Sequence, residues 1–185
     1  MFLPQRCVVC EVPGGALCSS CAAQLVPAPV GSPVPALVAY QGVGRAVMAN
    51  LKYRGARGVI GLVADGLARL APAGVQAVTW APTSAGRRQR RGFDQAELLA
   101  RAVARRLGVP ARRLLVRRAG DSPQTGQGRD ARLVGPSFVA VGLVPGRVLV
   151  VDDIVTTGAT LAAACTALRV GGAHRVWPVA VAATP

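Results

Sequence analysis

The apolar residues of this chain alternate between short continuous runs and longer stripes at helical spacing. Four consecutive Val and Leu residues at 148–151 are typical of a strand buried on both faces, as in a parallel sheet. Over 94–107 the apolar residues recur every three or four positions, Asp94 can cap the first turn, and Gly108 and Pro110 can end the last. By the same criteria we expect helices at 44–53, 59–70, 94–107 and 160–170 and strands at 75–80, 114–117, 137–141, 147–151 and 175–181.

This alternation of strands and helices predicts an α/β fold, with a mostly parallel sheet flanked by helices. Composition divides the chain into a cysteine-rich module at 1–26, a Pro-rich linker at 27–36 and the α/β domain at 37–185. The linker should be extended and fairly stiff. Within the domain, 119–134 is polar and rich in Gly, so we expect an irregular, mobile loop there.

Composition limits how the core can be built and where charge gathers. Hydrophobic residues make up 51% of the 185 residues but aromatic residues only 4%, so the core must consist of Val, Leu and Ala. The net charge is +14, and eleven Arg against two acids between 85 and 118 contribute much of it. Such a basic face favours a polyanion such as pyrophosphate or single-stranded DNA, or an acidic partner; an ordinary solvated surface is the alternative.

No part of the chain is typical of a secretory signal or a membrane span. The uncharged stretch at 12–44 is broken by Pro, Gly and Cys, and the stretch at 154–168 is short and rich in Ala and Thr. We therefore expect a cytoplasmic protein without membrane insertion.

Four cysteines near the amino terminus form two Cys-x-x-Cys pairs. Cys7 with Cys10 and Cys18 with Cys21 can supply four thiolates to a tetrahedral structural Zn²⁺. Disulfides are the alternative, although a cytoplasmic compartment disfavours them. Cys165 lies in an Ala-rich helical stretch and is expected to be a small core residue.

The strongest candidate site follows the apolar run at 148–151. Asp152 and Asp153 stand at the carboxyl end of the expected strand, where open α/β sheets bind ligands. The loop after them offers hydroxyls and helix-start N–H groups to a phosphate, and its residues are Thr156, Thr157, Gly158, Ala159 and Thr160. Two acids beside a phosphate loop suit sugar hydroxyls or Mg²⁺, so the pattern indicates a phosphoribosyl ligand. An ordinary strand–turn–helix is the alternative.

A second anion-binding loop is expected after the strand at 75–80, with a plain surface loop as the alternative. Thr83 and Ser84 supply hydroxyls there, and Arg87 and Arg88 supply charge. Arg129, from the irregular segment at 119–134, is a further candidate for contacting an anionic ligand.

The stretch at 148–160 resembles the phosphoribosyl-pyrophosphate (PRPP) binding signature of type I phosphoribosyltransferases. Over nearly its full length the chain also resembles the ComF family, competence-associated phosphoribosyltransferase-like proteins. That resemblance is carried by the four cysteines, Leu-Lys-Tyr-Arg-Gly at 51–55, Arg-Gly-Phe-Asp-Gln-Ala at 91–96, Gln-Thr-Gly at 124–126, Arg129, Arg132 and the 148–160 stretch. It implies a type I phosphoribosyltransferase fold, an amino-terminal zinc module, and a link to single-stranded DNA or a DNA-uptake protein in natural transformation.

Two functions of different class follow. As an enzyme, the protein would use Asp152 and Asp153 to hold the ribose of Mg²⁺–PRPP and would transfer the phosphoribosyl group with release of pyrophosphate. The loop at 120–132 would close over the bound substrate. As a binding module, it would sense PRPP or handle single-stranded DNA without catalysis. The acceptor-binding segment is expected near 36–53, and the sequence does not identify the acceptor.

Overall fold

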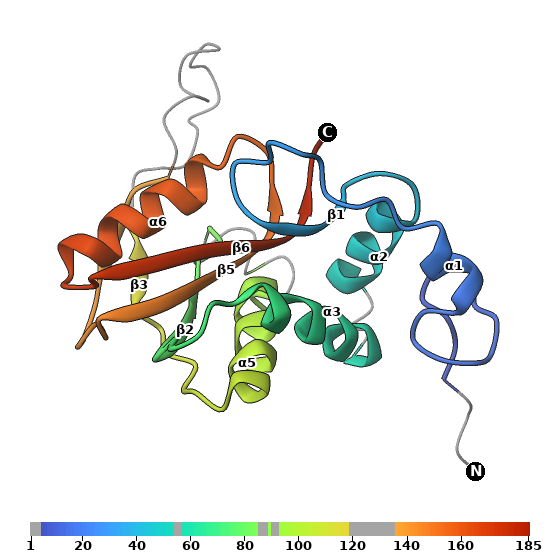
Figure 1. The fold of residues 1–185 in the computed structure, drawn as a ribbon, viewed down its shortest axis with the longest axis horizontal. Helices are drawn as coiled ribbons and strands as arrows, with labels where there is room; N and C mark the ends of the chain where they lie inside the picture. Colours follow the sequence, from blue (N-terminus) through green and yellow to red (C-terminus); the bar gives the residue numbers. More distant parts are fainter. Residues whose placement is uncertain (1–4, 54–56, 85–88, 90–92, 119–135) are drawn as a thin grey trace.

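The computed structural model describes residues 5–53, 57–84, 89, 93–118 and 136–185. At its centre lies a four-stranded sheet in the order β1 (Ala36–Ala39), β6 (Arg175–Ala183), β5 (Arg147–Val155) and β2 (Ala77–Trp80). All three pairings in this sheet are parallel. The predicted α/β fold with a mostly parallel sheet is therefore confirmed, and Figure 1 shows the helices on its two faces.

The two faces of the sheet are covered by different elements. On one face lie α2 (Gly42–Tyr53), α3 (Arg57–Leu70) and α5 (Gln95–Leu107). On the other lie α6 (Ala159–Val170) and an antiparallel ribbon of β3 (Leu115–Arg117) and β4 (Phe138–Ala140).

The apolar run of β5 is continuous because both faces of this strand are covered. Leu149 and Val151 pack with α3 and α5, whereas Val148 and Val150 pack with α6 and the ribbon. All four are fully buried. Side chains alternate between the faces of a strand, so a strand buried on both sides needs apolar residues at every position.

Helix α5 follows the sequence pattern closely. Asp94 caps it by accepting a hydrogen bond from the backbone N–H of Ala96 (3.2 Å), and Gly108 ends it in the left-handed region with φ 65°. Glu97 and Arg101 form the expected i, i+4 ion pair on the outer face, with 2.9 Å between Oε1 and Nη2. The predicted cap, helix end and polar face are confirmed.

One strand end and two additional elements are the main differences from the sequence expectation. Strand β5 continues to Val155 instead of ending at residue 151, because its pairing with β6 extends to Val155 opposite Ala183. The acid pair therefore lies inside the strand. Ala36–Ala39 forms the edge strand β1 beside β6, so the expected acceptor-binding segment at 36–53 starts with a strand of the main sheet. The short helix α1 (Ser19–Ala23) was also not expected.

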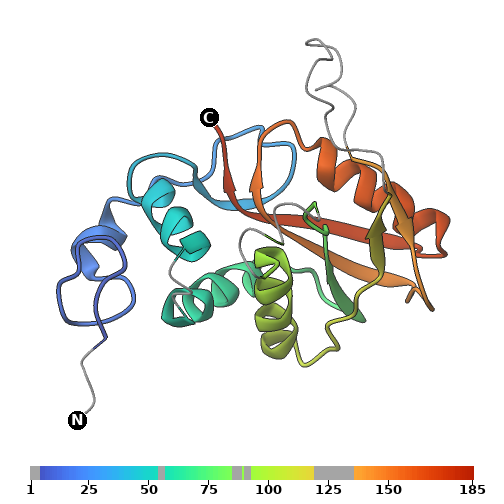
Figure 2. The same cartoon turned by 180° about the vertical axis from the view of Figure 1, so that it is seen from behind.

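The cysteine-rich module and the Pro-rich segment both contact the α/β domain. Asn50 of α2 donates a hydrogen bond from Nδ2 to the Val8 carbonyl (2.7 Å). The module lies at one end of the molecule, beside α2, in both Figure 1 and Figure 2. In the Pro-rich segment, Pro27 pairs with Val38 of β1, and Val34 is buried in the core. None of the described helices is long and apolar enough to cross a membrane.

Candidate functional site

A cleft of about 360 Å³ opens at the carboxyl ends of β2 and β5. Its walls come from the loop after β2, the start of α5, the end of β5 and the start of α6. The lining includes Thr83, Asp94, Asp152, Thr156 and Thr160. Parallel strands bring these segments, far apart in the sequence, to one edge of the sheet.

Asp152 and Asp153 line this cleft and are held by backbone hydrogen bonds. Oδ1 of Asp152 accepts from the backbone N–H of Asp153, and Oδ1 of Asp153 accepts from that of Ile154, both at 2.8 Å. Burial raises the pKa of Asp152 well above its usual value, and the charge of Asp153 raises it further. A cation or a set of sugar hydroxyls at this position would stabilise the charged form of Asp152.

Asp94 joins the loop after β2 to the start of α5. Its Oδ2 accepts from the backbone N–H of Thr83 (3.0 Å), while Oδ1 caps the helix. Burial raises the pKa of Asp94, although these N–H groups favour its charged form. The charge of Asp94 also adds to the rise in the pKa of Asp152, so three carboxyl groups share one cleft.

The turn between β5 and α6 has the geometry of an anion-binding loop. Gly158 has φ 77°, and a Cβ atom there would lie 2.9 Å from Cβ of Pro33, so the position requires glycine. The residue before α6, Gly158, has no side chain to cap the helix, and Oγ1 of Thr157 accepts from the N–H of Ala159 (3.4 Å). The first N–H groups of a helix lack partners within the helix, so those of α6 after Ala159 can donate to a phosphate beside the acid pair.

The structure brings together most, but not all, of the residues proposed from the sequence. The described ones in or beside the cleft are Thr83, Asp152, Asp153, Thr156, Thr157, Gly158, Ala159 and Thr160. Ser84 is half-buried next to Thr83. Arg87, Arg88, Arg129 and the loop expected to close lie outside the described residues.

Three polar or charged residues that line the cleft were not proposed as site residues from the sequence: Asp94, Gln95 and Arg117. Asp94 was assigned only a capping role, and Arg117 was counted only as part of the basic region. The available signal was the position of Asp94 and Gln95 in the Arg-Gly-Phe-Asp-Gln-Ala stretch, directly before the helical stripe.

The four amino-terminal cysteines gather into one cluster whose sulfur atoms all lie within 4.8 Å of one another. Sγ of Cys10 lies 3.6 Å from Sγ of Cys18. Tetrahedral zinc with Zn–S bonds of about 2.3 Å would place its sulfur ligands about 3.8 Å apart. The spacing therefore fits a metal such as zinc.

The local environments of these thiols differ. Backbone N–H groups of Cys10 and Cys18 lower the pKa of Cys7 to about 6, whereas burial and neighbouring thiols raise the pKa of Cys21 to about 12. Several thiolates this close would repel one another unless a cation lay between them. Cys165 of α6 is buried on the face of the sheet that is covered by α6 and the β3–β4 ribbon, as expected of a core residue.

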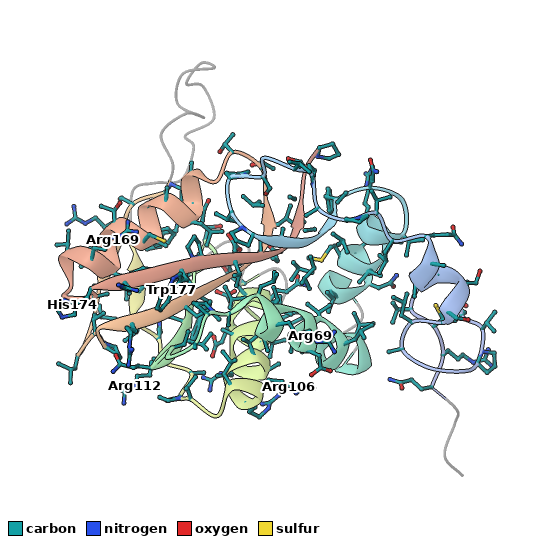
Figure 3. All side chains as sticks on the ribbon, in the orientation of Figure 1. Arg69, Arg106, Arg112, Arg169, His174 and Trp177 are labelled. Atoms are coloured by element: carbon teal, nitrogen blue, oxygen red, sulfur yellow. The ribbon has the colours of Figure 1, made fainter. Side chains whose placement is uncertain are left out.

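Other charged groups lie away from the cleft. Figure 3 shows His174 and Arg169 at the end of the molecule where β6 begins, which is the opposite edge of the sheet. Within the basic region, Arg101 pairs with Glu97 and lies over the ring of Trp80, 5.9 Å from its centre. Arg106 pairs with Asp65 at 2.9 Å. Ion pairs thus neutralise part of the basic face.

Residues 94–185 match the model of the phosphoribosyl transferase domain. An adenine phosphoribosyltransferase of Mycobacteroides abscessus is 40% identical over 116 residues, which are 60% of this chain and 62% of that protein. One of Treponema pallidum is 39% identical over 103 residues, or 51% of this chain and 50% of that protein. The chain thus spans less than two thirds of the length of these curated relatives.

Among solved structures, the glutamine PRPP amidotransferase from B. subtilis, complexed with ADP and GMP, superposes with a TM-score of 0.51. It is 22% identical, and the match covers 71% of this chain and 30% of that one. The fold is therefore that of the type I phosphoribosyltransferases. In sequence, the chain is thus similar to phosphoribosyltransferases over residues 94–185 and over the lengths matched by these relatives.

Proposed function

We propose that this protein binds PRPP in the cleft at the carboxyl ends of β2 and β5 and transfers its phosphoribosyl group to an acceptor. The observation that carries the proposal is the juxtaposition of the acid pair, Asp152 and Asp153, with the glycine-containing loop at 156–160. The match of residues 94–185 to the phosphoribosyl transferase domain supports it.

Each group has a distinct task in this reaction. The loop at 156–160 binds the 5′-phosphate and so fixes the position of the ribose. The acceptor attacks the anomeric carbon and loses a proton to water, and the bond from that carbon to pyrophosphate breaks with its electron pair leaving on pyrophosphate. Positive charge develops on the ribose during this step, and the carboxylates of Asp152 and Asp153, bound to its hydroxyls, stabilise that charge.

The acids of the cleft also fit a divalent cation. Asp94, Asp152 and Asp153 provide oxygen donors, which Mg²⁺ prefers, and a cation would offset the burial that raises the pKa of Asp152 and Asp94. When bound with PRPP, Mg²⁺ would neutralise part of the negative charge of the pyrophosphate group. Thr83, and Arg87 and Arg88 four and five residues after it in the sequence, are proposed to contact the pyrophosphate.

The finer assignments are part of the same proposal. The named function of the relatives makes adenine the first acceptor to test. The division into a module at 1–26, a linker at 27–36 and a domain at 37–185 is proposed, with Zn²⁺ held by the four clustered cysteines. The resemblance to the ComF family motivates the proposed link to DNA uptake, and we propose a cytoplasmic location.

Release of pyrophosphate from PRPP tests the proposal. The protein is incubated with Mg²⁺–PRPP and a panel of nucleobases and amines that begins with adenine. Acceptor-dependent release is expected from the wild type and from Asp65→Asn, whose carboxylate lies outside the cleft. Release should be lost in Asp152→Asn/Asp153→Asn. Binding of Mg²⁺–PRPP without release for any acceptor would favour the sensing function, and absence of binding would reject both.

A further inference from the structure

Gln95 is a buried polar residue of the cleft whose side chain has no hydrogen-bond partner among the described residues. It is the first residue of α5 and lines the cleft beside Asp94. Only 5% of the residue is exposed, and neither Oε1 nor Nε2 of its amide has a hydrogen-bond partner in the described part of the chain. Buried amide groups are rarely left unsatisfied, because their transfer from water is unfavourable without a new partner.

The helix itself does not need this amide. Asp94 already provides the cap of α5, and the next buried positions of the helix, Ala96 and Leu99, pack against apolar residues. A leucine at position 95 would serve packing without leaving polar atoms unpaired. The amide is therefore best explained by something that binds in the cleft.

The position of Gln95 indicates which part of a bound ligand its side chain contacts. The cleft is lined by the loop after β2, the start of α5, the end of β3, the end of β5 and, with Thr156 and Thr160, the turn into α6; no described lining residue comes from β1 or β6. Gln95 follows Asp94, whose carboxylate holds the backbone of Thr83 on the loop after β2. Gln95 is therefore next in sequence to the residue that fixes the loop after β2, where the leaving group is proposed to bind.

The hydrogen-bonding groups of the amide indicate which chemical groups the ligand must offer. A side-chain amide offers an acceptor oxygen and two N–H donors, whereas phosphate oxygens alone can only accept. A metal-bound pyrophosphate provides both complements: its oxygens accept from Nε2, and the hydrated cation interacts with Oε1. We infer that Gln95 binds the metal–pyrophosphate part of PRPP, an inference that rests on the function proposed above.

Calorimetry with three ligands tests this role without relying on catalysis. The Gln95→Leu variant should bind Mg²⁺–pyrophosphate and Mg²⁺–PRPP about 10- to 100-fold more weakly than the wild type, as expected for lost hydrogen bonds to charged groups. Its affinity for ribose 5-phosphate, which lacks pyrophosphate, should be unchanged. Without ligand, its melting temperature should be equal or higher, because the substitution removes an unsatisfied buried amide.

Gln76→Leu provides a matched control. Oε1 of Gln76 accepts from the backbone N–H of Arg147 (3.0 Å) at the amino end of the strands, away from the cleft. This variant should lower the melting temperature and leave all three affinities unchanged. It separates loss of a structural hydrogen bond from loss of a ligand contact.

Each further outcome contradicts a defined statement. If the wild type binds Mg²⁺–PRPP and Gln95→Leu binds it equally well, the role of Gln95 is wrong and the proposed function stands. If Gln95→Leu weakens ribose 5-phosphate as much as pyrophosphate, the residue only shapes the cleft and the inference is also wrong. If the wild type binds none of the three ligands, the proposed function fails, and the inference fails with it.

Discussion

The cysteine cluster and the acidic cleft are both candidate cation sites, but they are built in opposite ways. All four thiols come from one short segment, between positions 7 and 21. The cleft instead draws its side chains from segments between Thr83 and Thr160 that only the sheet brings together. The first site depends on local spacing, and the second depends on the whole fold.

This difference decides what each site needs from its ligand. Among the described residues of the cysteine module only Cys7 and Cys21 are buried, so a metal would supply much of its folding free energy. The cleft stands on strand β5, whose residues 148–151 are fully buried, so the core of the domain holds it in place. Its three acids are close together and buried, and both features disfavour the charged carboxylates. The pKa values of Asp94 and Asp152 are raised for this reason.

Removing the acid pair should have the largest effect on ligand binding. We expect Asp152→Asn/Asp153→Asn to lower the affinity for Mg²⁺–PRPP about 100-fold or more, because both substitutions remove charged acceptors of hydrogen bonds. The domain should stay folded, since the asparagines keep the side-chain size. Calorimetry measures the affinity and circular dichroism the fold. Equal affinity in the wild type and the double variant would show that the acid pair of the cleft does not bind Mg²⁺–PRPP.

Removing metal should affect the cysteine module far more than the cleft. The purified protein is expected to contain about one equivalent of zinc, as one Cys₄ site holds one ion. A chelator, or Cys10→Ser, should abolish hydrogen-exchange protection over residues 5–26 and preserve it in β5. Cys165→Ser is the matched control and should keep its zinc. A metal-free protein with a protected module would show that the module folds without metal.

The cost of the clustered acids should appear as a dependence of stability on pH. Because the pKa of Asp152 is raised in the folded protein, its contribution to stability is greatest at low pH and is lost as pH rises through that raised pKa. Asp152→Asn should therefore gain stability over the wild type as pH increases from 4 to 8 without Mg²⁺. Thermal unfolding measures this, with the exposed Asp65→Asn as control. If the stability advantage of Asp152→Asn over the wild type became smaller as pH rises, the raised pKa of Asp152 would not be the cause.

Asp94→Ala should have a smaller effect, on both stability and binding. The variant loses the helix cap, typically about 1–2 kcal/mol, and leaves the N–H of Thr83 without its partner. Chemical unfolding should show this loss, and Mg²⁺–PRPP affinity should fall several-fold. Glu97→Ala removes only an exposed ion pair with Arg101 and should cost less than about 1 kcal/mol. Similar losses in the two variants would argue against a bridging role for Asp94.

The smallest effect is expected at the basic face of α5. Binding of a labelled single-stranded oligonucleotide should be weak, independent of sequence and steeply dependent on salt. Arg101→Glu/Arg105→Glu should reduce it only partly, because Glu97 already neutralises Arg101 in the wild type. Fluorescence anisotropy at low salt measures the change. Undetectable binding, or no effect of charge reversal, would exclude this face as a DNA site.

Much of the fold and half of the site can be predicted from local sequence patterns. The run at 148–151 identifies the central strand because a strand buried on both faces cannot tolerate polar positions, and Asp94 with Gly108 marks the ends of α5 because caps are local. The acid pair, the loop at 156–160 and the four cysteines are visible as short motifs. Each depends on neighbours within a few residues, which a linear pattern contains.

Tertiary structure decided the rest. The sequence could not place Ala36–Ala39 as an edge strand, because this strand pairs with β6, which lies more than a hundred residues later. It also could not extend β5 to Val155, because that extension depends on pairing with Ala183 of β6, about thirty residues away. The sequence also could not show that Asp94 accepts a hydrogen bond from the backbone of Thr83, or that the buried amide of Gln95 has no partner in the described part of the cleft. Burial and long-range contact are properties of the packed chain, so the sequence determined the candidate motifs and the fold decided which residues share a site.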